Sequence, residues 1–243
     1  SGSESELTLI HTSNSVYPDL KASRVLVVGL GAIDRIDTNV IRRVAATVIR
    51  RLRDVGVKNF ATIVHGAGIG GVDVSSSTQS LVEGSLLGAY RFLKYRTTDN
   101  KRKPDVESMI IVESDSTKLT AISDAITKGV AYSNAEILAR DLVNEPANKL
   151  SPADLASVAL KVSNDNGLHC EVLDEADVSQ LGMGAYAGVA QGSSRPLKFI
   201  HMSYLGDSSS LENNLWLIGK GITFDSGGIS LKPGLGMGKM KGD

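Results

Sequence analysis

Cysteine is nearly absent from this sequence, since the 243 residues include only Cys170. Because a disulfide needs two cysteines, none can form within the chain. Cys170 lies in the apolar run LHCEVL, where we expect a small buried side chain rather than a nucleophile. The lack of disulfides fits a reducing compartment, and we expect a cytoplasmic protein.

Long hydrophobic runs and an excess of one charge are missing as well. No stretch approaches the roughly 18 apolar residues of a membrane-spanning helix, and the first residues, SGSESELTL, lack a signal-peptide pattern. The 26 basic and 27 acidic side chains leave a formal net charge of −1. Nucleic-acid and membrane-surface binders normally carry a basic excess, so the sequence argues against both kinds of partner.

The motifs of two common hydrolase classes are also lacking. The four histidines are scattered, and none belongs to an HExxH or HxH pattern, which argues against a histidine-based zinc site. A serine hydrolase usually carries GxSxG at a nucleophile elbow, and the segment DSGG at 225–228 lacks the required preceding glycine.

The sequence does contain an alternation of short apolar runs and amphipathic stretches. The Val-rich run at 24–29 is typical of a buried strand, and apolar residues recur at helical spacing from Asp37 to about residue 54. We expect further strands at 58–64, 107–113, 168–173, around 186–190, at 197–204 and at 214–219, and helices at 76–94, 117–143 and 151–164. This alternation predicts two α/β units with parallel or mixed sheets covered by helices.

Two glycine-rich loops follow predicted strands, at 25–34 (VLVVGLGAID) and at 62–71 (TIVHGAGIGG). Either they cradle a phosphate or nucleotide-like ligand with backbone N–H groups, or they are tight strand exits that need positive φ angles. The segment VDVSSST after Gly71 delays the next helix, which disfavours a dinucleotide site. We expect His65, beside the second loop, to be packed or bound to solvent.

The last stretch, NLWLIGKGITFDSGGISLKPGLGMGKMKGD at 214–243, concentrates charged residues among glycines. An apolar run leads to Lys220, and Asp225, Lys232 and Asp243 follow. A charged residue directly after a buried strand usually lies at the carboxyl edge of a sheet, where α/β proteins place their sites. From the residues alone, a site for an ion or ligand and a charged, glycine-rich terminal segment are equal alternatives.

The run IGKGITFDSGGISLKPG, followed by MKGD, resembles the signature of the leucyl aminopeptidase family of dinuclear metallopeptidases. The resemblance extends through ARDLVNEPANKLSPADLA, GMGAYAGVAQGS and SLVEGSLLGAYRFLKY, the last being similar to the family's regulatory or oligomer-forming domain. It implies an N-terminal macro-like α/β domain at 1–120, a long connecting helix at 121–143 and the N-terminal part of a metallo-aminopeptidase catalytic domain at 144–243.

The resemblance also implies roles for individual residues. Lys220, Asp225 and Asp243 match metal ligands, and Lys232 matches the lysine that contacts the reacting carbonyl of the substrate. The implied cofactors are two divalent ions, Zn²⁺, Mn²⁺ or Mg²⁺. The implied substrates are peptides with a free N-terminus, from which residues such as Leu are released, and the implied assembly is a homohexamer.

One part of the family pattern has no counterpart in residues 1–243. In the family, a later segment of the type NTDAEGR supplies an Asp and a Glu to the metals and an Arg that holds a bicarbonate. We therefore expect an incomplete catalytic domain, no hydrolysis by these 243 residues alone, and exposed apolar surface in the unit that begins near residue 144.

Overall fold

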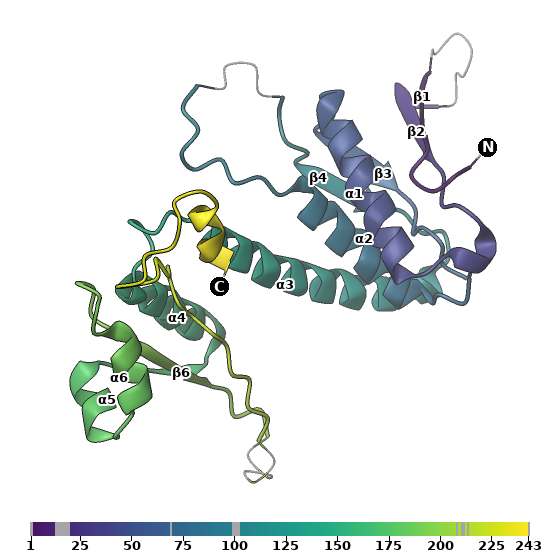
Figure 1. Cartoon of the computed structure of the whole chain (residues 1–243). Helices are drawn as coiled ribbons and strands as arrows, with labels where there is room; N and C mark the ends of the chain where they lie inside the picture. The colour runs from purple at the N-terminus through teal and green to yellow at the C-terminus, as the bar shows by residue number, and fades with distance from the viewer. Residues whose placement is uncertain are drawn as a thin grey trace. The chain divides into compact units, whose positions relative to one another are not determined.

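The computed structural model describes residues 2–12, 20–68, 70–98, 103–207, 209, 212 and 214–242 (Figure 1). The chain divides into two compact units, Ser1–Ala139 and Arg140–Asp243. Helices and strands occur in both units, which confirms the predicted α/β class. Within the described ranges, no helix is long and apolar enough to cross a bilayer.

The described residues of the N-terminal unit form two small sheets rather than a single larger one. Strand β1 (Leu7–His11) pairs antiparallel with β2 (Arg24–Val28), and β3 (Asn59–Thr62) pairs parallel with β4 (Ser108–Ile111). The strands predicted at 24–29, 58–64 and 107–113 are thus present in shorter form. Strand β1 is not among the predicted strands, because its five residues carry a weak pattern and depend on pairing with β2.

Helix α1 (Thr38–Asp54) provides most of the core of this unit. It begins after Asp37, whose Oδ1 accepts a hydrogen bond from the backbone N–H of Val40 at 2.7 Å. The apolar face that the helical spacing predicts is buried. Its buried residues are Val40, Ile41, Val44, Ala45, Val48, Ile49 and Leu52. One side of this face packs on the β1–β2 sheet and Phe60, and the other packs on Leu81 and on β4.

Helix α2 (Val74–Ala89) lies beside α1 (Figure 1) and contacts its backbone closely. A Cβ atom added to Gly84 would lie 2.3 Å from the carbonyl oxygen of Arg42, and one added to Gly88 would lie 2.5 Å from the Cα of Ala46. Only glycine permits this approach. The helix predicted at 76–94 corresponds to α2, which ends earlier, at Ala89.

An ion pair crosses the same helix interface. Nε of Arg42 lies 2.5 Å from Oε2 of Glu83, and the amide of Gln79 donates to the other carboxylate oxygen at 2.7 Å. The Glu83 side chain is nearly buried, so both of its oxygens are satisfied by these donors rather than by water.

Helix α3 (Leu119–Asn144) matches the long helix predicted at 117–143, and the boundary between the two units falls inside it. Its first half buries Ile122 and Ala125 in the N-terminal unit. The domain boundaries that the sequence suggests, 1–120, 121–143 and 144–243, remain a prediction.

The C-terminal unit contains helix α4 (Pro152–Asn166), an antiparallel pair of strands, β5 (His169–Leu173) and β6 (Phe199–Ser203), and two short helices, α5 (Glu175–Gln180) and α6 (Gly184–Ala190). A capping box starts α4, in which the side chains of Ser151 and Asp154 bind each other's backbone N–H groups. Gly167 ends the helix with a left-handed φ of 67°.

Two predicted strands of this unit are wrong. Residues 186–190 belong to helix α6, where the phenolic O–H of Tyr186 donates to the carbonyl of Lys198 at 2.7 Å. Residues 214–219 form no strand, because the described residues offer them no pairing partner. Consequently Leu215, Leu217 and Ile218 are almost fully exposed, in line with the apolar surface expected for this unit.

Candidate metal centre

The candidate site lies in an irregular segment of the C-terminal unit, not at the end of a strand as the sequence predicts. The segment turns between Asp225 and Lys232, and a hydrogen bond from the backbone N–H of Lys232 to the carbonyl of Ser226 closes the turn at 2.9 Å. Gly227 and Gly228 have φ angles of 96° and 63°. A Cβ atom on Gly227 would lie 2.3 Å from the carbonyl oxygen of Ser230, so the turn requires glycine there.

Asp225 is held through both carboxylate oxygens. Oδ2 accepts from Nζ of Lys232 at 2.7 Å, and Oδ1 accepts from the backbone N–H of Gly227 at 2.8 Å. The hydrogen bond from Lys232 and then that from Gly227 lower the pKa of Asp225, and the positive charge of Lys220 lowers it further. Asp225 is therefore an ionised carboxylate at neutral pH, as a metal ligand must be.

Lys232 has a second contact, because its Nζ lies 3.1 Å from Sδ of Met240. Met240 belongs to the short 3₁₀ helix η3 (Met237–Gly242). The same helix is tied to the turn by Lys241, whose Nζ donates to the carbonyl of Thr223 at 3.1 Å. Partial burial lowers the pKa of Lys241. Helix η3 thus contacts the amine of Lys232 through Met240.

Two of the four residues that the resemblance implies are in direct contact, and a third is close enough for its charge to act on them. Lys232 contacts Asp225 directly, and the charge of Lys220 acts on the same carboxylate. Asp243 lies outside the described residues. Within the described part of the chain, no three His, Cys, Asp or Glu side chains converge. Asp225 can offer oxygen and Lys220 nitrogen to a divalent ion. Two side chains do not complete the coordination of such an ion, so further ligands are needed.

The backbone conformation of the second glycine-rich loop indicates a tight strand exit rather than a phosphate site. Gly66, Gly68 and Gly71 have φ angles of 74°, 77° and 77°, which explains the glycines. The N-terminus of α2 is capped by Asp73, whose carboxylate accepts from the N–H of Ser76 at 2.9 Å. The Asp73 carboxylate thus takes up one of the N–H donors that a phosphate bound at this helix start would use.

His65 is packed, as expected. Its Nε2 lies 2.9 Å from Oγ1 of Thr62, and burial lowers its pKa, so it is neutral at pH 7. Cys170 is half-buried in β5 rather than fully buried.

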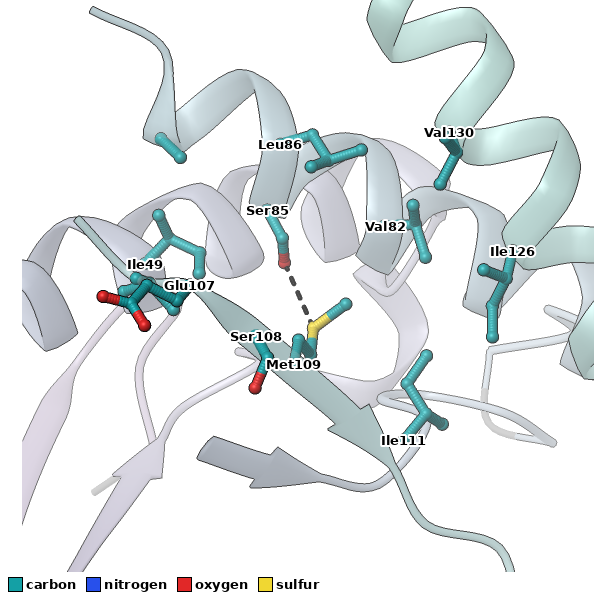
Figure 2. Close-up of a pocket in the computed structure, with 12 residues that line it drawn as sticks. Ile49, Val82, Ser85, Leu86, Glu107, Ser108, Met109, Ile111, Ile126 and Val130 are labelled. Carbon is teal, nitrogen blue, oxygen red and sulfur yellow. Dashed lines mark hydrogen bonds between the residues drawn. The ribbon is translucent and has the colours of Figure 1, made fainter. Parts of the chain in front are cut away.

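A pocket of about 290 Å³ lies in the N-terminal unit (Figure 2). Apolar side chains from α1, α2, α3 and β4 line most of it, and Ser85 donates to Sδ of Met109 at 3.7 Å. Glu107, at its edge, is paired with Lys58 at 2.8 Å. The lining lacks a convergent set of polar groups, so the chemistry of this chain is better sought around Asp225.

The model of the cytosol aminopeptidase family N-terminal domain matches residues 1–99, and the model of the catalytic domain of the same family matches residues 137–243. The chain belongs to the cytosol aminopeptidase family. The candidate site lies within the part that matches the family's catalytic domain.

Individual relatives of this family member cover the whole of its sequence. A probable cytosol aminopeptidase of Alkaliphilus metalliredigens is 37% identical over 100% of this chain and 47% of that relative. One of Solibacter usitatus is 39% identical over 100% of this chain and 48% of the relative. The chain therefore spans about half the length of the curated relatives it matches.

A solved structure with the same fold is that of the bottromycin maturation enzyme BotP in complex with Mn. Its TM-score is 0.83 at 28% identity, covering 100% of this chain and 48% of that chain. The resemblance that the sequence motifs indicate is thus confirmed. What the motifs do not indicate are the contacts of Asp225 with Gly227 and of Lys232 with Met240, since these depend on how the turn and η3 approach each other.

Proposed function

We propose that this chain serves in a metal-dependent aminopeptidase that releases N-terminal amino acids, with a preference of the leucine type, from peptides with a free N-terminus. The observation that carries the proposal is the turn that places Lys232 against Asp225, inside the segment matched by the family's catalytic domain. The Mn complex of BotP supports a divalent metal. The substrates and the cytoplasmic location remain part of the proposal.

Asp225, Lys220 and Asp243 would hold two divalent ions, Zn²⁺, Mn²⁺ or Mg²⁺. Asp225 offers two carboxylate oxygens and is ionised, and Lys220 would bind as the neutral amine. An adjacent dication offsets the cost of removing the proton from a lysine. When bound, the ions supply an activated water and a positive charge for the reacting carbonyl.

Lys232 would act on the substrate rather than on the metal. As an ammonium group it can donate a hydrogen bond to the oxyanion that forms when water adds to the peptide carbonyl. A main-chain bond to Ser226 holds its backbone, and its amine contacts Asp225 and Met240, so Lys232 already lies at the proposed metal site before a substrate arrives. Donors of this kind lower the barrier because they need no reorganisation during the reaction.

We expect the 243 residues alone to be inactive, because no three His, Cys, Asp or Glu side chains converge among the described residues. An underliganded ion exchanges easily, so turnover needs further ligands. We expect purified 1–243, confirmed by mass, to show no hydrolysis of leucine p-nitroanilide with added Mn²⁺ or Zn²⁺. Turnover comparable to that of a form as long as the curated relatives would contradict this expectation. A homohexamer is the proposed assembly, which sedimentation would test.

The central test is Asp225→Asn, made in a form of the protein as long as its curated relatives. The change keeps the size of the side chain but removes the charge and one strong ligand oxygen. We expect turnover to be abolished and the bound metal, measured by elemental analysis, to fall. Asp207→Asn is the matched control, because Asp207 is an exposed loop residue of the same unit. Two metals per subunit in the Asp225→Asn protein would exclude Asp225 as a ligand.

A further inference from the structure

The amine of Lys232 lies on the carboxylate that the proposed function assigns to the metal. Its Nζ is 2.7 Å from Oδ2 of Asp225, while Oδ1 is bound by the N–H of Gly227. Both side chains are partly open to solvent, at 34% for Lys232 and 42% for Asp225. The pair is therefore accessible to a cation arriving from solution.

We propose that Lys232 and the divalent metal ion compete for Oδ2 of Asp225, so that metal loading releases the Lys232 amine. This inference rests on the proposed function, because it takes Asp225 as a metal ligand. Lys232 is then an internal counter-ion of the carboxylate until a metal ion replaces it.

The competition follows from charge and distance. A divalent ion binds a carboxylate oxygen at about 2.0–2.2 Å. An ammonium group hydrogen-bonded to the same oxygen would then lie within a few ångströms of the dication, where the two positive charges repel. Oδ1 already accepts the Gly227 N–H at 2.8 Å, and an amine bound to its remaining lone pair would still lie close to the dication, so moving to Oδ1 would not remove the repulsion.

The backbone geometry lets the amine move without unfolding the turn. The turn itself is closed by the main-chain bond from Lys232 to Ser226, which does not involve the side chain. The amine also contacts Met240, but a thioether is a weak acceptor and holds it less firmly than a carboxylate does. Release would free Lys232 beside the metal, where the proposed function needs it, so loading and activation would be one event.

The expected size of the effect is modest. Ion pairs between partly exposed side chains are weak, and removing this competitor should tighten metal binding by about two- to fivefold. This change is opposite in sign to the one expected if Lys232 were a metal ligand, because removing a ligand weakens metal binding.

The experiment measures Mn²⁺ binding by isothermal titration calorimetry in a form as long as the curated relatives. Lys232→Gln and Lys232→Met both remove the charge, and either should tighten binding two- to fivefold. Lys232→Arg keeps a cation that can hold the carboxylate and should bind Mn²⁺ no more tightly than the unchanged protein. Lys239→Gln is the control, because it removes the same charge from an exposed position in the same segment.

Unchanged or weaker Mn²⁺ binding in both Lys232→Gln and Lys232→Met would overturn the inference, as would equal tightening by Lys239→Gln. Asp225→Asn distinguishes a failure of the competition from a failure of the proposed metal site. Loss of Mn²⁺ binding in Asp225→Asn together with no change in the Lys232 variants leaves the proposed site intact and rejects only the competition. Full Mn²⁺ binding in Asp225→Asn rejects the site itself.

Discussion

The α1–α2 interface of the N-terminal unit and the segment at 214–242 of the C-terminal unit are ordered by different forces. Ile41 and Leu81 are 0% and 2% exposed, and the two helices touch through glycines. In the other segment Leu217 is 88% exposed, and polar contacts around Asp225 define the turn. The first region therefore depends on apolar burial, and the second on a few directed hydrogen bonds.

This difference separates residues that determine stability from residues that determine chemistry. Burial stabilises roughly in proportion to the apolar area removed from water, so changes in the helix interface should alter the free energy of unfolding. The polar turn buries little, so changes there should alter function and leave unfolding nearly unchanged.

After the loss of turnover expected for Asp225→Asn, the largest effect is expected at Lys232, in a form of the protein as long as its relatives. Lys232→Ala should lower kcat by about 10²–10³-fold, because it removes a donor to the oxyanion. Bound metal, measured by elemental analysis, should not fall. Lys239→Ala serves as the control for the lost charge. A variant that lost its metal but kept kcat for the remaining loaded fraction would instead make Lys232 a ligand.

A smaller effect is expected where α1 and α2 touch. Gly84→Ala should lower the free energy of unfolding by about 1–3 kcal/mol, since the new methyl group would clash with the Arg42 carbonyl. Gly188→Ala, in α6, meets nothing within 4 Å and should be neutral or stabilising by up to about 1 kcal/mol. Urea denaturation followed by circular dichroism compares the two. Equal effects would mean that the helices are not in close contact.

The smallest effect is expected at the exposed apolar run. Leu217→Ser should change the free energy of unfolding of the 243-residue chain by no more than about 0.5 kcal/mol, because the side chain has little contact to lose. Leu81→Ser is the buried counterpart and should be strongly destabilising, since it leaves a cavity and a buried hydroxyl. A large fall in the free energy of unfolding for Leu217→Ser would show that this segment, too, depends on apolar burial.

The same contrast explains what could be predicted from the sequence. The buried face of α1 was predictable because helical spacing is a local property, and Asp37 is a local cap. The run at 214–219 looks like a strand, but a strand forms only with a partner, and its own residues do not reveal one. The glycine- and alanine-rich run around 186–190 carries no clear period, so its helical state was missed.

The site was predictable as a set of residues but not as a set of contacts. The motif identifies Lys220, Asp225 and Lys232 through resemblance, whatever their surroundings. The contact between Lys232 and Met240 depends on the path of the chain through η3, which spacing alone does not determine. The bond from Gly227 to Asp225 depends likewise on the left-handed conformation of that glycine.

Helix α3 has a practical consequence for anyone who wishes to divide this protein. The compact units meet at residues 139 and 140, yet α3 continues to Asn144. A cut at the unit boundary would remove residues 140–144 from α3 and leave a new helix end without its following turn, and such ends fray. An N-terminal fragment should therefore retain α3 to its end, and proteolysis inside α3 should be slower than in the loops beside it.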